Sequence, residues 1–195
     1  MSSPLGTRER ILDETRRLMV ERRGEGVRIE DIAQAAGVSR QAVYMHFGSR
    51  SGLLIATVRY ADETLNLTER TRPIREAKSP IQALEATVEW WANYIPDIYG
   101  LAKALLTARE TDKAAAAAWE DRMNALYSGC RNRIQWLIDE GLLSPGWSLE
   151  EAADFLWATI SIANWENLTI ECGWTNEQFI ERIQHVLKKT LVKAP

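Results

Sequence analysis

Arginine and glutamine stand side by side at positions 40 and 41, inside the segment SRQAVYMHFGSR of residues 39–50. An arginine side chain can donate two hydrogen bonds to O6 and N7 of guanine, and a glutamine can bridge N6 and N7 of adenine. Arg40 and Gln41 are therefore candidates for reading base edges, and Ala42 beside them could touch a thymine methyl group. Such chemistry requires a short exposed helix that fits the major groove of DNA.

The residues around this pair predict a second helix and a tight turn that would hold the exposed helix in place. Ala33 lies where one helix must approach another closely, Gly37 suits the left-handed conformation that closes a helix, and Val43 fills the corner between two helices. Ser39 is a typical N-cap. The spacing therefore predicts a helix-turn-helix, with a tight turn after Gly37.

Apolar residues recur at helical intervals along the whole chain, and no run alternates as a strand would. With 195 residues and 46% hydrophobic content, the chain can form a packed core. We expect an all-α fold of about nine helices, with Pro96 ending or kinking one of them. The expected helices cover residues 7–22, 29–36, 40–46, 50–71, 80–95, 101–107, 114–140, 149–170 and 176–191.

The net charge is −3, which by itself argues against a nucleic-acid partner. The first 50 residues nevertheless hold nine arginines against seven acidic residues, whereas the remainder is acidic. A modestly basic surface at one end is enough for phosphate contact. The acidic total predicts weak non-specific affinity for DNA.

Enzymes and metalloproteins are poorly matched by this sequence. It has two histidines, His46 and His185, and no serine-hydrolase, zinc-protease or glycine-rich phosphate motif. Cys130 and Cys172 lack metal-site spacing, so we expect no metal and no cofactor. The N-terminus has no apolar signal core and no segment is long enough to cross a bilayer, so we expect a cytoplasmic protein.

A resemblance to a known family rests on the pattern Asp31-Ile32-Ala33, Ala35-Ala36-Gly37-Val38-Ser39, Tyr44, Phe47 and Ser49-Arg50. Over about the first 60 residues this pattern resembles the TetR (tetracycline-repressor-like) family of bacterial transcription regulators. The resemblance implies a three-helix DNA-binding domain over residues 1–48 and a helical-bundle domain over residues 49–195 for ligand binding and dimerisation. The helix from residue 50 would bridge the two.

The function implied is a repressor that binds a double-stranded, palindromic operator as a homodimer and is released by a small apolar or aromatic effector. The alternatives are an activator of the same family and a small-molecule-binding protein with little DNA activity.

The resemblance also implies contacts with DNA phosphates. We expect Ser39, Tyr44 and His46 to contact phosphates, and the tyrosine and the histidine resemble donors that the family places on the DNA backbone. Arg50 stands where the family usually has lysine, and Arg28 stands where it often has a threonine or serine cap, so there a cap is lost and a charge is gained. The structural alternative is that the tyrosine and histidine close the hydrophobic corner and the arginines are solvated surface charges.

All eight tryptophans lie after residue 89, in the predicted ligand-binding domain. A large core would explain them, and so would an apolar cavity with a few polar anchors. Asn164 is one candidate anchor, although an asparagine satisfied within the core is the alternative. The candidate pocket residues are Trp90, Trp91, Tyr94, Tyr99, Trp119, Met123, Trp157 and Asn164.

The expected helix 149–170 is apolar on nearly all sides, so we expect it to be buried on two of them, one against a second copy of the chain. The helix 176–191 would lie beside it in a four-helix interface. The candidate interface residues are Phe155, Ile160, Ile162, Phe179, Ile183, Val186 and Leu187.

Overall fold

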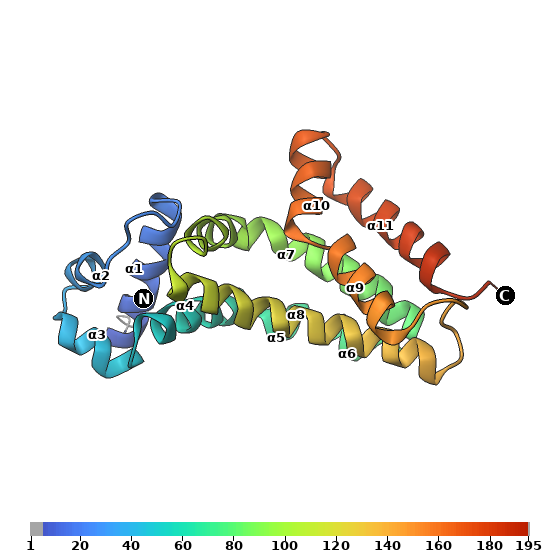
Figure 1. The fold of residues 1–195 in the computed structure, drawn as a ribbon, viewed down its shortest axis with the longest axis horizontal. Coiled ribbons are helices and arrows are strands. Elements are labelled where there is room, and N and C mark those ends of the chain that lie inside the picture. The colour runs from blue at the N-terminus through green and yellow to red at the C-terminus, as the bar shows by residue number, and fades with distance from the viewer. Residues whose placement is uncertain (1–5, 195) are drawn as a thin grey trace. The chain divides into compact units, whose positions relative to one another are not determined.

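The structure is a computed structural model that describes residues 6–194 (Figure 1). Within these residues the chain is helical, with no strand and one isolated antiparallel bridge between Leu143 and Val192. The all-α prediction is therefore confirmed. No helix in this part of the chain is both long and apolar enough to span a membrane. The elements are α1 (Thr7–Glu21), α2 (Ile29–Ala35), α3 (Arg40–Phe47), α4 (Arg50–Thr64), α5 (Leu67–Arg70), α6 (Arg72–Arg75), α7 (Pro80–Ala108), α8 (Lys113–Asp139), α9 (Leu149–Thr159), α10 (Ile162–Glu166), the π-helix η1 (Asn167–Glu171) and α11 (Asn176–Leu191).

The chain divides into two compact units. Unit 1 comprises the chain up to Asn66 together with Ile98–Met123, and unit 2 comprises Leu67–Asp97 together with the chain from Asn124 onward. The helices α7 and α8 contribute residues to both units. The division of function between residues 1–48 and 49–195 stays a prediction, since its boundary lies inside unit 1.

The core of unit 1 is formed by α1, α2, α3 and α4, which pack against one another, and by the parts of α7 and α8 that belong to this unit. Only Val43 is fully buried on α3, where it is 1% exposed. Burial of an aliphatic side chain of this kind stabilises the folded state by about 1.5–3 kcal/mol. The short helix α3 is therefore held in place chiefly through Val43. The surrounding buried side chains include Ile11, Leu12, Met19, Ile32, Leu53 and Leu54.

The turn between α2 and α3 has the predicted geometry. Gly37 has a φ of 66°, in the left-handed region that disfavours residues with a Cβ atom. The N–H of Val38 donates to the carbonyl of Ala33 at 2.9 Å, which closes the end of α2. At the start of α3, the Ser39 hydroxyl accepts a hydrogen bond from the N–H of Ala42 at 3.1 Å. The sequence therefore predicted this helix-turn-helix correctly.

In unit 2 the core gathers aromatic side chains around α7, α9 and α11. Trp91, Tyr94 and Phe179 are among the largest fully buried side chains. The indole N–H of Trp91 donates to the carbonyl of Ile160 at 2.6 Å, at the end of α9. This hydrogen bond satisfies a backbone carbonyl that the end of a helix leaves without an intrahelical partner.

The prediction that a helix ends near Pro96 and another begins at residue 101 was wrong, because α7 runs continuously from Pro80 to Ala108. A proline inside a helix costs about 3 kcal/mol, since it removes one hydrogen bond and crowds the preceding turn. Buried side chains on both sides of the proline, Ile95 and Leu101 among them, keep α7 in its core positions.

Two other predicted helices are shorter than expected. α4 ends at Thr64 rather than near residue 71, because Asn66 takes up a left-handed conformation with a φ of 54°. The predicted helix 149–170 is interrupted after Thr159, where the Ser161 hydroxyl accepts from the N–H of Asn164 at 3.2 Å and caps α10. Serine and asparagine both favour such local breaks, since their side chains bond to nearby backbone.

We predict that Gly24→Ala destabilises the chain more than Gly26→Ala does. Both glycines have positive φ values, 81° and 62°, so alanine at either one costs about 1–2 kcal/mol of backbone strain. A Cβ at Gly24 would also lie 2.1 Å from the carbonyl oxygen of Ala104, whereas a Cβ at Gly26 would meet nothing within 4 Å. Overpacking should add about 1–3 kcal/mol at position 24. Urea denaturation measures both variants, and equal losses of stability would contradict the close approach.

Candidate nucleic-acid interface

The exposed side of α3 carries the side chains predicted to contact DNA. Val43 faces the core, whereas Arg40, Gln41, Tyr44 and His46 are exposed. Tyr44 is 42% exposed, which does not fit the alternative that it closes a hydrophobic corner. Ala42 is half-buried, at the edge of the exposed side. All three predicted base-reading residues therefore lie on one short helix.

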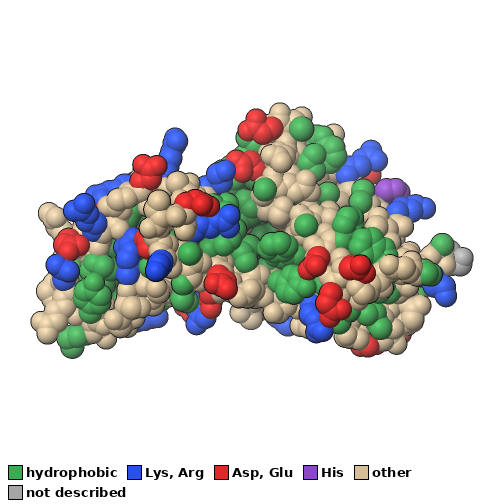
Figure 2. Space-filling model, in the orientation of Figure 1, with side chains coloured by type: hydrophobic (Ala, Val, Ile, Leu, Met, Phe, Trp, Pro, Cys, Tyr) green, Lys and Arg blue, Asp and Glu red, His purple; other side chains and the backbone are tan. Residues whose placement is uncertain are grey.

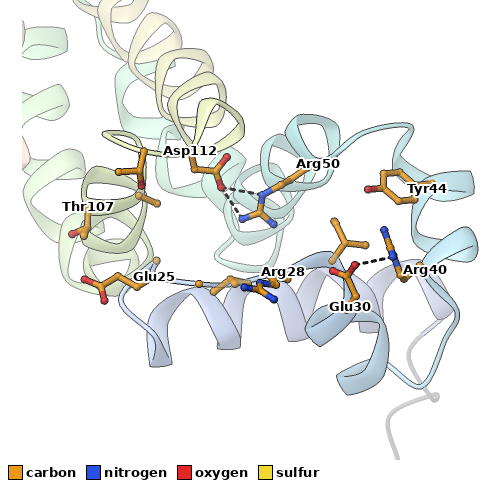
Figure 3. Close-up of a pocket in the computed structure, with 14 residues that line it drawn as sticks. Glu25, Arg28, Glu30, Arg40, Tyr44, Arg50, Thr107 and Asp112 are labelled. Carbon is orange, nitrogen blue, oxygen red and sulfur yellow. Dashed lines mark hydrogen bonds and ion pairs between the residues drawn. The ribbon is translucent and has the colours of Figure 1, made fainter.

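A cleft of about 790 Å³ in unit 1 brings together four of the predicted contact residues (Figure 3). Arg40 and Tyr44 line it from α3, Arg50 from the start of α4, and Arg28 from the residue before α2. These side chains come from three different segments, so the fold and not the sequence spacing makes them neighbours. The other predicted contacts, Ser39, Gln41, Ala42 and His46, do not line this cleft.

Arg50 is held by a carboxylate that the sequence analysis did not identify. Its Nε and Nη2 atoms donate to Oδ2 of Asp112 at 2.9 and 2.7 Å, in the turn between α7 and α8. The third guanidinium nitrogen, Nη1, is buried and has no hydrogen-bond partner in the described part of the chain. Both hydrogen bonds of the Arg50 guanidinium therefore go to Asp112. No sequence signal links two residues that are 62 positions apart.

Asp112 is ionised more readily than an ordinary aspartate. Partial burial opposes ionisation, but the hydrogen bonds from Arg50 and from the N–H of Ala114, the latter at 2.8 Å, outweigh it and lower the pKa of Asp112 below 3.8. The side chains of Arg50 and Asp112 are each about one-quarter exposed, so water screens their interaction only in part.

Arg40 forms a weaker pair, with Glu30 of α2, at 2.8 Å. Both side chains are more than half exposed, and such surface pairs contribute about 0–1 kcal/mol. On the face shown in Figure 2, basic and acidic side chains are interspersed over unit 1. A DNA phosphate or guanine edge could therefore take Arg40 from Glu30 at low cost.

Arg28 differs from the other two arginines. No carboxylate in residues 6–194 forms an ion pair with its guanidinium, so its charge is available to a ligand. As expected, its side chain does not cap α2. Instead the backbone N–H of Arg28 donates to Oδ2 of Asp31 at 3.2 Å. The carboxylate in the first turn of α2 therefore compensates for the missing cap.

The predicted ligand-pocket residues are divided between the two units. Trp91 and Tyr94 belong to the core of unit 2, and the amide of Asn164 donates to the carbonyl of Thr159 at 2.6 Å. Tyr127 meets Trp157 edge-on, with 6.3 Å between ring centroids. Three others, Tyr99, Trp119 and Met123, belong to unit 1.

A groove of about 410 Å³ in unit 2 is lined by one of these candidates, Trp90. The indole N–H of Trp90 is buried and lacks a hydrogen-bond partner within residues 6–194. Buried indole N–H groups normally have a partner, so this donor is available to a ligand. The groove also has polar residues that were not predicted from the sequence: Arg70, Glu89, Asn93 and Asp97.

Five of the seven predicted interface residues are buried in the core of their own chain: Ile160, Ile162, Phe179, Ile183 and Leu187. Two remain accessible to a partner, Val186 at 43% exposure and the half-buried Phe155. Ile170 of η1, which the sequence analysis did not name, is 51% exposed. An interface in this region would therefore use the outward sides of η1, α9 and α11.

Comparisons with known proteins fit the α1–α4 arrangement. Residues 11–57 match a family model described as bacterial regulatory proteins, tetR family. The transcriptional repressor AcnR of Corynebacterium glutamicum is 24% identical over 153 residues, which cover 78% of this chain and 77% of AcnR. The transcriptional regulator CymR of Pseudomonas putida is 28% identical over 172 residues, which cover 85% of this chain and 78% of CymR. These relatives are regulators of transcription and not enzymes.

A solved structure shares the fold along nearly the whole chain. FadR, a transcriptional regulator of Bacillus subtilis crystallised with stearoyl-CoA, superposes with a TM-score of 0.71. The match covers 91% of this chain and 96% of FadR at 15% sequence identity. The common fold therefore extends through both units.

We predict that Asp112→Asn destabilises the chain by about 1 kcal/mol at neutral pH, between the values for exposed and buried ion pairs. Asparagine can still cap α8 but removes the charge opposite Arg50. Because folding lowers the pKa of Asp112, its ionisation stabilises the native state above pH 3.8, and this stabilisation is lost as the pH falls below that value.

Wild type and Asp112→Asn should therefore converge in stability in acid, as measured by urea denaturation across pH. Asp121→Asn is the control, since Asp121 pairs with the exposed Arg59 at 2.8 Å and should cost little at any pH. A difference between wild type and Asp112→Asn that does not shrink as the pH falls below 3.8 would contradict the role of the charge.

Proposed function

We propose that the chain, whose residues 11–57 match the model of the TetR family of bacterial regulatory proteins, is a ligand-responsive repressor that binds a palindromic operator as a homodimer. The observation that carries this proposal is the exposed side of α3. A helix docked through Val43 presents Arg40, Gln41 and Tyr44 to the solvent, beside a cleft lined by two further arginines.

In the proposed complex α3 lies in the major groove of DNA. Arg40 leaves Glu30 and donates to a guanine, Gln41 bridges an adenine, and Ala42 contacts a thymine methyl group. The exposure of the pair Arg40–Glu30 supports this exchange, since the pair is weak in water.

The proposed phosphate contacts surround this helix. Ser39 retains its hydroxyl proton as a donor while it caps α3, and Tyr44 and His46 are exposed. Arg28 is free of ion pairs within the described residues. Arg50 can reach a phosphate only after it leaves Asp112, because its remaining Nη1 atom is buried. These contacts position the protein and carry no sequence information.

We further propose a small apolar or aromatic effector. The stearoyl-CoA bound to FadR supports ligand binding by this fold. In the present chain the groove beside Trp90, with its unpartnered indole N–H, supports an aromatic or apolar ligand that carries a hydrogen-bond acceptor. A screen for compounds that raise the melting temperature identifies such a ligand.

We predict that Arg40→Ala weakens binding to the operator that the wild-type chain selects from random duplex DNA, by about 1–3 kcal/mol. The loss should come with relaxed preference at one base pair in each half-site, because a base-reading contact is removed. Binding assays at about 150 mM salt measure the effect, since specific sites there normally exceed random DNA by about 10³ or more.

Arg59→Ala is the matched control for this prediction. Arg59 of α4 is also exposed and forms a 2.8 Å ion pair, with Asp121, but lies outside the proposed interface. It should leave the operator preference unchanged. Failure of the wild type to select any sequence would overturn the proposed function, and equal effects of the two variants would overturn the role of Arg40.

We predict that the wild-type chain sediments as a dimer of two 22.1-kDa protomers at micromolar concentration and that Val186→Glu shifts it toward monomer. A carboxylate at an apolar interface loses its hydration on association. Val20→Glu on α1 is the control, because Val20 has nearly the same exposure, 42% against 43%. A monomeric wild type, or equal dissociation by both variants, would contradict the proposed interface.

A further inference from the structure

Met45 is the most exposed large apolar side chain in the described part of the protein. It is 81% exposed, whereas the others of this kind are between 38% and 51% exposed. It lies on α3, the helix that carries the proposed base-reading residues. Leaving a methionine in water forgoes the free energy that its burial provides, about 1.5–3 kcal/mol. We therefore asked which binding partner could bury the Met45 side chain.

The exposed part of α3 has two adjacent rows of side chains. Arg40 and Tyr44, four residues apart, both line the cleft with Arg50 (Figure 3). Gln41 and Met45, also four residues apart, are exposed but do not line it. Residues at this spacing stack on one face of a helix. Met45 therefore accompanies Gln41, on the row next to the cleft.

The chemistry of methionine limits what Met45 can contact on DNA. Its thioether donates no hydrogen bond and its sulfur is a weak acceptor, so it gains nothing from a phosphate oxygen. The major groove offers one apolar group, the C5 methyl of thymine. The flexible, polarizable side chain of methionine adapts to such a small apolar target.

We propose that Met45 is a specificity-determining residue that packs on a thymine methyl group in each half-site of the operator. This inference rests on the proposed function. Because helical side chains lean toward the N-terminus of their helix, Met45 covers the surface over the turn that holds Gln41. The thymine it contacts therefore lies at or next to the base pair that Gln41 reads.

The test compares thymine with deoxyuridine, which lacks only the C5 methyl group. The full-length wild-type chain first selects its operator from random duplex DNA, and each thymine of that operator is then replaced singly by deoxyuridine. At the thymine that Met45 contacts in each half-site, the wild type should lose affinity by about three- to tenfold, the effect of burying one methyl group. Met45→Ala should bind the thymine and deoxyuridine operators equally at that position.

Two further variants sharpen the result. Met45→Leu keeps an apolar side chain of similar size and should retain sensitivity to the methyl group. Val20→Ala shortens an exposed apolar side chain on α1 and should behave as wild type at every thymine. Since Met45 is exposed, Met45→Ala should melt as the wild type does, which separates loss of contact from loss of fold.

The outcomes distinguish this inference from the function on which it rests. If the wild type selects an operator but Met45→Ala keeps the full sensitivity of the wild type at every thymine, the role of Met45 is overturned and the proposed function stands. If the wild type selects no sequence, the proposed function fails and the role of Met45 fails with it.

Discussion

The arrangement of unit 1 follows from the shortness of α3. A helix of eight residues is not stable alone in water, since isolated helices below about 12–15 residues are marginal. α3 is stable because Val43 is buried in the core of unit 1, because Ser39 caps its start, and because the left-handed Gly37 ends the preceding helix. These constraints use one side of α3 and its two ends. The exposed side of α3 does not hold the helix in the fold, so the residue types on that side can serve contact with a partner.

The same region shows how an acidic protein can present arginines to DNA. Arg40 and Arg50 are each paired with a carboxylate, Glu30 and Asp112, so the free chain offers DNA less positive charge than its sequence suggests. For either of these two arginines, a contact with DNA must replace its carboxylate by a phosphate or a base edge. Random DNA supplies phosphates but not the correct base edges, so this competition weakens non-specific binding more than specific binding. It also fits the net charge of −3.

The sequence predicted local structure well and long-range contacts poorly. The helix-turn-helix, its N-cap and its turn follow from residues within a few positions of one another, and they were predicted correctly. The continuity of α7 through Pro96 was not, because the packing that outweighs the proline involves residues distant in sequence. The end of α4 at Thr64 had a local signal that was missed, the left-handed Asn66.

Of the candidate site, the exposed residues of α3 could be predicted from periodicity alone. The partner of Arg50 could not, since 62 positions separate it from Asp112. The aromatic residues of unit 2 could not be sorted into core and groove, because both environments select the same residue types.

The hydrogen bond from the N–H of Ala114 gives Asp112 a second role, as the group that caps α8. Near the N-terminus of a helix, unpaired backbone N–H groups and the helix dipole stabilise a negative charge by about 0.3–1 kcal/mol or more. When Arg50 departs, the carboxylate therefore keeps part of its electrostatic support and gains water in place of the guanidinium. The cap therefore lowers the free-energy cost that Asp112 would bear if Arg50 left it, because the carboxylate would keep one backbone hydrogen bond.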